Sequence, residues 1–326
     1  MPELRKDPVL GRWVIIATER AKRPKDFTHA PPVPPAERAC PFCPGNEELT
    51  PPEISRRPGP LGWAVRVVPN RFPALDSVGP ATRQGSGIYD RVAGVGAHEV
   101  IIDSPAHDRQ LADLSADELA GVVAAWRERA CALEQDKRLR YVLIFKNHGP
   151  AAGASLEHSH CQLIATPVLP VLVKSELDGA QRYHRFRSRC VYCDMLKQER
   201  TDKARLVAEH DGFLTFAPFA PRFPFETWLL PLEHFGSFAA LDERRVSGLA
   251  RALKDALDRM NRVLDRPDYN FVVHCTPLDC PDAEHYHFHI ELMPKLTIIA
   301  GFEVGTGFYI NPVPPEDAAA YLRGEK

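Results

Sequence analysis

No apolar stretch in this sequence is long enough to cross a membrane, and its first residues lack the apolar run of a secretory signal. The chain of 326 residues also lacks an excess of charge, because 41 Lys and Arg residues are balanced by 43 Asp and Glu residues. Nucleic acids and acidic membranes are bound by surfaces with excess positive charge. We therefore expect a cytoplasmic protein that binds small molecules, with no nucleic acid and no membrane as a partner.

Cysteine is scarce, at eight residues, and four of these form two Cys-x-x-Cys pairs. Disulfides are rare in proteins that are not exported, so we expect the pairs to bind metal. The other four have no such spacing and are interpreted as ordinary thiols: Cys131, Cys161, Cys275 and Cys280.

Each cysteine pair begins a longer pattern that occurs twice in the same order, in which a single histidine and then a His-x-His motif follow the pair. The first copy comprises Cys40, Cys43, His107, His158 and His160, and the second comprises Cys190, Cys193, His234, His287 and His289. Such a repeat indicates that one structural unit was duplicated. The length suits two domains, which we place at residues 1–180 and 181–326.

Both halves also repeat one succession of predicted elements. An apolar strand ends in a polar loop with the single histidine, at residues 99–107 and 226–234. An amphipathic helix follows, and in the first half Ser115 and Glu118 form a capping box at its start. A further strand, at 140–146 or 270–274, leads toward the His-x-His motif. The sequence therefore predicts an α+β fold with a mostly antiparallel sheet and flanking helices in each half.

The repeated side chains suit zinc, which prefers a tetrahedron of thiolate and imidazole ligands. We predict two zinc ions per chain, held by Cys40, Cys43, His107 and His158 and by Cys190, Cys193, His234 and His287. A redox role for Cys-x-x-Cys is the alternative, but it explains neither the second copy nor the histidines. Rival ligands for the second ion, with iron as an alternative metal, are Glu176, His274, His285 and His289. Ions with four protein ligands would be structural.

The segment 145–162 joins small residues to the first His-x-His motif. Gly149 and Gly153 permit close approach of backbone N–H groups to a phosphate, and the Ser155 hydroxyl can add a hydrogen bond. On a strand His160 and Gln162 share one face. An imidazole with one nitrogen held by a hydrogen bond can attack phosphorus with the other. His160 is the predicted nucleophile; the alternative is a second histidine that serves only the zinc.

The two halves differ at the position two residues after the second histidine of the motif. Gln162 cannot titrate and can only offer hydrogen bonds, which favours group transfer over hydrolysis. Glu291 takes the equivalent place in the second half and would repel a phosphate. No glycine and serine cradle precedes His287. The second half is therefore predicted to be a scaffold.

Over almost its whole length the chain resembles the galactose-1-phosphate uridylyltransferases, the nucleotidyl-transferring branch of the histidine triad superfamily. The resemblance is carried by Asn147-x-Gly-x-x-x-Gly153-x-Ser155-x-x-His158-x-His160-x-Gln162, with further matches at 20–24, 40–43, 65–75 and 301–303. It implies tandem histidine-triad-like domains and a homodimer whose site is completed by the partner subunit. It also implies a ping-pong reaction in which His160 takes the nucleotidyl group of a nucleotide sugar, releases hexose 1-phosphate and passes the group to a second hexose 1-phosphate.

The resemblance also assigns roles to individual residues. Asn70 would hold the ribose, and Glu303 the hexose hydroxyls. The remaining assigned residues bind phosphate: Asn147, Gly153, Ser155 and Gln162 the nucleotide phosphates, and Arg20 and Arg23 the sugar phosphate.

The chain departs from the uridylyltransferase motif, which has Pro and Gly where Ser159 and Cys161 stand here. With the second Cys-x-x-Cys pair, this resembles a branch that includes plant-type ADP-glucose phosphorylases, which transfer an adenylyl group to inorganic phosphate by the same histidine chemistry. UDP-glucose:galactose-1-phosphate uridylyltransferase is the leading hypothesis and ADP-glucose phosphorylase the alternative. A nucleotide-binding hydrolase and a non-catalytic nucleotide sensor are disfavoured by Gln162 and by the intact His160.

Overall fold

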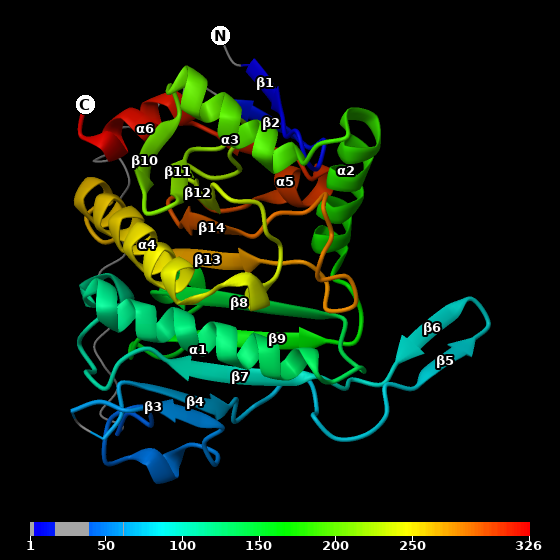
Figure 1. The fold of residues 1–326 in the computed structure, drawn as a ribbon, viewed down its shortest axis with the longest axis vertical. Coiled ribbons are helices and arrows are strands. Elements are labelled where there is room, and N and C mark those ends of the chain that lie inside the picture. Colours follow the sequence, from blue (N-terminus) through cyan, green and yellow to red (C-terminus); the bar gives the residue numbers. More distant parts are fainter. Residues whose placement is uncertain (1–2, 17–38, 61) are drawn as a thin grey trace.

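The computed structural model describes residues 3–16, 39–60 and 62–326. Its centre is a ten-stranded sheet in which all neighbouring strands are antiparallel (Figure 1). From one edge to the other the strands are β10 (Leu206–His210), β11 (Phe213–Phe216), β12 (Thr227–Pro231), β14 (His289–Pro294), β13 (Tyr269–His274), β8 (Tyr141–His148), β9 (His160–Thr166), β7 (Ala97–Ile102), β4 (Val65–Pro69) and β3 (Ser55–Arg57). Pairing of β8 with β13 joins the sheets of the two halves into one.

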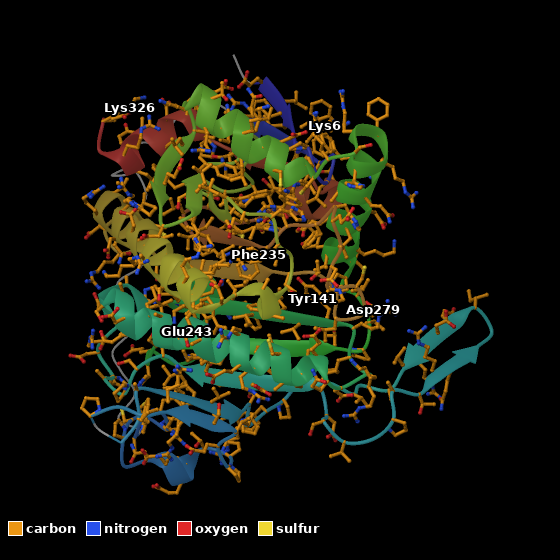
Figure 2. The ribbon with its side chains drawn as sticks, viewed as in Figure 1. Lys6, Tyr141, Phe235, Glu243, Asp279 and Lys326 are labelled. Atoms are coloured by element: carbon orange, nitrogen blue, oxygen red, sulfur yellow. The ribbon has the colours of Figure 1, made fainter. Side chains whose placement is uncertain are left out.

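Two long helices, α1 (Ala116–Glu134) and α4 (Glu243–Leu264), lie side by side across one face of this sheet (Figure 1). The predicted capping box of α1 is present: Glu118 N donates to Ser115 Oγ at 3.2 Å, and Ser115 N donates to Glu118 Oε2 at 2.7 Å. Figure 2 shows Tyr141 and Phe235 inside the packed interior, whereas Lys326 is at the surface. The apolar sides of both helices form one core with the sheet.

Smaller elements surround this centre. The further helices are α2 (Val171–Arg187), α3 (Val191–Asp202), α5 (Gly301–Thr306) and α6 (Pro315–Arg323), with short 3-10 turns η3 (Glu47–Leu49), η4 (Leu111–Asp113), η5 (Pro150–Ala152) and η6 (Phe238–Ala240). A small sheet contains β1 (Glu3–Lys6), β2 (Trp13–Ile16) and β15 (Tyr309–Asn311), and β5 (Arg83–Ser86) pairs with β6 (Tyr89–Val92) in a projecting hairpin (Figure 1). None of the helices in the described ranges combines the length and apolarity of a membrane span.

The side chains of the predicted site project from the sheet face that lies away from α1 and α4. Residues that oppose each other in antiparallel strands project to the same side. His160 opposes Ile102, Gln162 opposes Val100, and Asn147 opposes Asn270. Val100 and Ile102 pack with Phe42 in a cluster separate from the core under α1. The predicted α+β class, with antiparallel sheets and flanking helices, is confirmed, and the site is built on the face away from α1 and α4.

Candidate functional site

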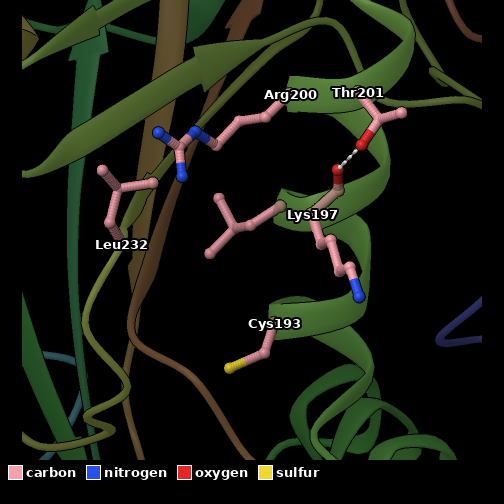
Figure 3. A pocket seen from close by; sticks show the side chains of 6 residues that line it. Cys193, Lys197, Arg200, Thr201 and Leu232 are labelled. Atoms are coloured by element: carbon pink, nitrogen blue, oxygen red, sulfur yellow. Dashed lines mark hydrogen bonds between the residues drawn. The ribbon is translucent and has the colours of Figure 1, made fainter.

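A cavity of about 370 Å³ lies beside α3 (Figure 3). It is lined by Cys193, Leu196, Lys197, Arg200, Thr201 and Leu232. Arg200 is held by an ion pair with Glu209 at 3.0 Å, and Thr201 donates to the Lys197 carbonyl at 2.8 Å. The cavity reaches one predicted metal ligand, Cys193, but not His160.

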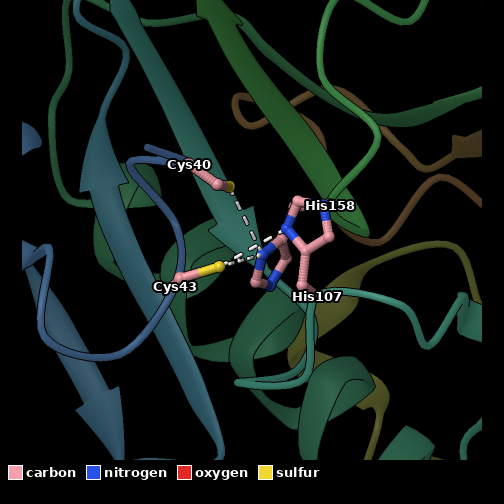
Figure 4. Close-up of side chains that lie close together, drawn as sticks. All are labelled: Cys40, Cys43, His107 and His158. Atoms are coloured by element: carbon pink, nitrogen blue, oxygen red, sulfur yellow. Dashed lines mark hydrogen bonds between the residues drawn. The ribbon is translucent and has the colours of Figure 1, made fainter. Parts of the chain in front are cut away.

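The first cysteine pair and its two histidines converge on one point (Figure 4). Cys43 Sγ lies 3.4 Å from His107 Nδ1 and 3.7 Å from His158 Nδ1, and Cys40 Sγ lies 3.6 Å from His158 Nδ1. Zinc–sulfur and zinc–nitrogen bonds at a tetrahedral angle place the two ligand atoms about 3.6 Å apart. The four side chains therefore fit a tetrahedral zinc ion without rearrangement.

The second ring nitrogen of His158 shows which nitrogen is free for a metal. His158 Nε2 lies 2.7 Å from the Ser104 carbonyl, which can only accept a hydrogen bond. The proton must sit on Nε2, so Nδ1 offers its lone pair to the cysteine side. Such a bond to the far nitrogen is typical of metal-binding histidines.

The second cluster repeats this geometry. Cys193 Sγ lies 3.4 Å from His234 Nδ1 and 3.6 Å from His287 Nδ1, and His287 Nε2 donates to the Pro231 carbonyl at 2.9 Å. With Cys190 these side chains have their ligand atoms within 4.8 Å of one another. All eight predicted metal ligands are thus grouped as the sequence repeat suggests.

The rival ligands of the second site form a separate buried cluster. Glu176, His274, His289 and Glu291 have their ligand atoms within 4.8 Å of one another. Burial opposes charge on His274, but Glu176, 3.2 Å from its Nδ1, raises the pKa to about 10. The ring of His285 faces His184 instead. His289 therefore groups with the carboxylates and His287 with the cysteines.

His160 has the geometry of a nucleophile. Its Nδ1 lies 2.9 Å from the His158 carbonyl, an obligate acceptor, so Nδ1 carries the proton and Nε2 keeps its lone pair. Burial, followed by the charge of Lys146, lowers the pKa of His160 and keeps the ring neutral. Phe42, from the cysteine loop, contacts the ring edge-on with centroids 5.3 Å apart. The loop of the first cysteine pair thus supports the His160 side chain.

The sequence analysis missed a buried ion pair beneath His160. Lys146 Nζ donates to Asp103 Oδ2 at 2.8 Å, to Ser159 Oγ at 2.9 Å and to the His160 carbonyl at 2.9 Å. Lys146 is only 1% exposed and lies on the α1 side of the sheet. The signal available in the sequence for this ion pair was a lysine, Lys146, within an otherwise apolar predicted strand. The pair fixes the backbone that carries His160.

The loop after β8 contains η5 and leads into β9, which begins at His160. Gly149 has φ 80°, and a Cβ there would lie 1.9 Å from Asp268 Oδ1, so only glycine fits. Asp268 Oδ2 accepts a hydrogen bond from Ala151 N at 2.6 Å. Gly153 also has a left-handed φ of 86°, and Ser155 is exposed. The second half of the chain thus braces the loop that the sequence predicts to hold phosphate.

His98 on β7 is a further residue that the sequence analysis missed. Its Nε2 lies 2.9 Å from Gln162 Oε1 and 3.1 Å from Asn70 Nδ2, and its Nδ1 accepts from Ala74 N at 3.1 Å. His98 therefore brings together Asn70, predicted to hold ribose, and Gln162, predicted to hold phosphate. The signal available in the sequence was strand alternation, which places His98 on the same face of β7 as Val100 and Ile102.

Glu303, another predicted site residue, does not lie beside His160 within a single chain. The carboxylate of Glu303 accepts from Ala300 N at 3.1 Å at the start of α5. Figure 1 shows α5 beside α2, several strands away from β9. Arg20 and Arg23 lie outside the described residues.

Sequence comparison relates both halves to one family. The family profile for the galactose-1-phosphate uridyl transferase N-terminal domain matches residues 1–170, and that for its C-terminal domain matches residues 176–320. ADP-glucose phosphorylase of Arabidopsis thaliana is 38% identical, covering 99% of this chain and 92% of the relative. Galactose-1-phosphate uridylyltransferase of Thermotoga maritima is 30% identical, covering 99% and 98%.

Solved structures agree with these relatives. The crystal structure of an ADP-glucose phosphorylase from Arabidopsis thaliana with bound ADP-glucose has a TM-score of 0.84 at 36% identity, covering 99% of this chain and 98% of that one. A uridylyltransferase structure has a TM-score of 0.79 at 29% identity, covering 99% and 98%. The chain therefore belongs to the galactose-1-phosphate uridylyltransferase family and is a nucleotidyltransferase.

Proposed function

We propose that this chain transfers a nucleotidyl group from a nucleotide sugar through a covalent bond to His160 Nε2. The observation that carries this proposal is the tautomer of His160. Its proton is held on Nδ1 by the His158 carbonyl at 2.9 Å, which leaves an unprotonated Nε2 on the sheet face away from α1 and α4. Gln162 lies on the same face, and the loop with Gly149 and Gly153 joins the end of β8 to β9.

The reaction has two balanced steps. His160 Nε2 attacks the α-phosphorus, a nitrogen–phosphorus bond forms, and the bond from that phosphorus to the oxygen of the sugar phosphate breaks. Hexose 1-phosphate leaves with the electron pair and needs no strong acid. In the second step a phosphate oxygen of the acceptor attacks the same phosphorus, and Nε2 is released. The proton stays on Nδ1 throughout, hydrogen-bonded to the His158 carbonyl.

The other predicted residues keep the roles that the family resemblance gives them. Asn70 would hold the ribose, and the nucleotide phosphates would be held by Asn147, Gly153, Ser155 and Gln162. Arg20 and Arg23 would contact the sugar phosphate, and Glu303 the hexose hydroxyls. The distance of α5 from β9 supports a homodimer, in which Glu303 of one subunit serves the site of the other. The boundary between the catalytic domain and the scaffold domain is proposed near residue 180.

We also propose one zinc ion in each cysteine cluster. The ligand atoms have spacings that suit a tetrahedral ion, and each buried histidine has its far nitrogen bonded to a carbonyl. When bound, the ions supply cross-links and no reaction chemistry, since four protein ligands leave no open position. In the first half, Cys40 and Cys43 would thereby hold Phe42 against His160.

Two donor and acceptor pairs are candidates. The first is UDP-glucose with galactose 1-phosphate, the activity named in the family profiles and in the Thermotoga maritima relative. The second is ADP-glucose with phosphate, which is supported by the higher identity of 38% to the Arabidopsis thaliana phosphorylase. The covalent step is common to both.

One experiment tests the proposal. The protein is incubated with UDP-glucose or with ADP-glucose, and intact mass is measured for an acid-labile increase equal to a uridylyl or an adenylyl group. Peptide mapping should place the adduct on His160, and galactose 1-phosphate or phosphate should then discharge it. The nucleotide that forms the adduct and the acceptor that removes it decide between the candidates. Absence of an adduct with both donors would overturn the mechanism.

A further inference from the structure

Two side-chain amides on the sheet face away from α1 and α4, Gln162 and Asn147, are both held by their oxygen atoms. We propose that His98 and Asn270 are positioning residues that fix these two amides with their NH₂ groups free to donate to the nucleotide phosphates. If either amide were flipped, its oxygen atom would face the phosphate, and the oxygen lone pairs would repel the anion. The inference rests on the proposed function, because it assumes that phosphate occupies this face.

The orientation of Gln162 follows from the backbone. Ala74 N–H can only donate, so His98 Nδ1, 3.1 Å away, must be the acceptor. In a neutral ring the proton then lies on Nε2. The Gln162 atom 2.9 Å from Nε2 must accept that proton and is the oxygen Oε1. Asn70 Nδ2, at 3.1 Å, is a donor and cannot compete for the same proton.

The orientation of Asn147 follows from a carbonyl. The Ala152 oxygen can only accept, so the Asn270 atom 2.9 Å away is the NH₂ nitrogen. The same nitrogen lies 2.8 Å from the Asn147 side chain, whose facing atom must therefore be Oδ1. Asn147 Nδ2 is left on the side of Gly153, where a Cβ would lie 3.9 Å from it.

Both NH₂ groups are otherwise unused. Among the residues that the structure describes, neither Gln162 Nε2 nor Asn147 Nδ2 donates a hydrogen bond. Both side chains are half-buried, so that their donors remain within reach of a ligand. A site whose amides can only donate selects an anion, and the orienting bonds are made before the substrate arrives. Asn270 belongs to the second half, which thus contributes to a site whose nucleophile it does not supply.

The test measures single-turnover formation of the nucleotidyl adduct in His98→Phe and Asn270→Leu variants, which lose the donor but add no charge. Loss of a hydrogen bond to a charged group slows a step by about 10- to 100-fold. We expect a decrease of this size in each variant, and His98→Gln, which retains an NH₂ donor, should recover most of the rate. Asn311→Leu is the matched control. Asn311 Nδ2 also donates to two carbonyls, at 3.1 and 3.0 Å, but this residue ends β15 in the small sheet, away from the phosphate loop.

A double-mutant cycle shows whether each residue acts through its amide. His98→Phe should slow a Gln162→Ala protein by less than about threefold, and Asn270→Leu should do the same in Asn147→Ala. Equal slowing in both backgrounds, or an equal loss of rate in Asn311→Leu, would overturn the inference. Wild-type rates in His98→Phe and Asn270→Leu would also overturn it while leaving the proposed function intact. A wild-type protein that forms no adduct would instead refute the proposed function.

Discussion

His160 and His289 occupy equivalent positions in the two halves and have nearly the same local geometry. The Nδ1 of each lies close to the carbonyl of the residue two positions earlier, at 2.9 Å in the first half and 2.8 Å in the second. The preceding histidine of each motif forms an edge-to-face pair with the single histidine, with ring centroids 5.3 and 5.1 Å apart. The repeated sequence therefore builds the same framework twice.

The surroundings of the two rings differ. His289 is completely buried, with the His274 ring stacked 4.5 Å away and the Tyr192 ring 5.0 Å away. Burial, with the charge of His274 as the next cause, lowers the pKa of His289 to about 4. Glu291 stands where the first half has Gln162, and Arg222 pairs with it. We therefore expect a nucleophile in the first half alone, where the uncharged Gln162 stands in place of a carboxylate that would repel a phosphate.

The largest expected effect on adduct formation comes from removing the imidazole rings of His160 and His289 in turn. His160→Ala should reduce adduct formation by at least about 10³-fold, because no other group attacks the phosphorus. His289→Ala should still form the adduct, although the cavity it leaves lowers stability by about 2–5 kcal/mol. Intact mass after incubation with the nucleotide sugar measures both. An adduct that persists in His160→Ala would show that the two halves have been assigned the wrong way round.

The second prediction places a glutamate, the counterpart of Glu291 in the second half, at position 162 of the first half. Gln162→Glu should slow adduct formation by about 100-fold at neutral pH, because a carboxylate repels the phosphate and cannot donate to it. Lowering the pH to about 5 should recover part of the rate as the carboxyl group takes up a proton. Gln162→Met, which has no charge, is the control and should show no such recovery. Equal rates for the Glu and Met variants would mean that charge at this position does not distinguish the halves.

Sequence reasoning anticipated local geometry that is set by short spacing. The Cys-x-x-Cys pairs and the capping box at Ser115 are each contained in a few residues, and the structure groups the side chains accordingly. The role of the motif around His160 stays a prediction. His98 and Asn270 were not found, because their roles depend on how distant strands align. Asn270 faces Asn147 only through the register of β13 on β8, and no local pattern specifies that register.

The two clusters of cysteine and histidine give a third, smaller contrast between the halves. Cys43→Ser and Cys190→Ser should each lose one of two zinc ions per chain in elemental analysis. Only Cys43→Ser should also slow adduct formation, by about tenfold, because the loop with Phe42 packs on His160. If Cys190→Ser kept two ions, the second metal would be held by the cluster of Glu176 and His274 instead.

The smallest expected effect is a pH dependence confined to the second half. The pKa of His274 is raised from 6.5 to about 10, because the carboxylates of Glu176 and Glu291 outweigh the effect of burial. A raised pKa stabilises the folded state fully below pH 6.5, and this contribution is lost as the pH rises toward 10. His274→Gln should therefore melt about 5 °C below the wild type at pH 6.5, with the difference shrinking by pH 10. His148, whose pKa burial lowers to about 4, provides a control, because His148→Gln should show no loss of this kind at alkaline pH. A gap between His274→Gln and the wild type that stayed constant from pH 6.5 to 10 would show that His274 is neutral in the folded protein and places no charge beside the ring of His289.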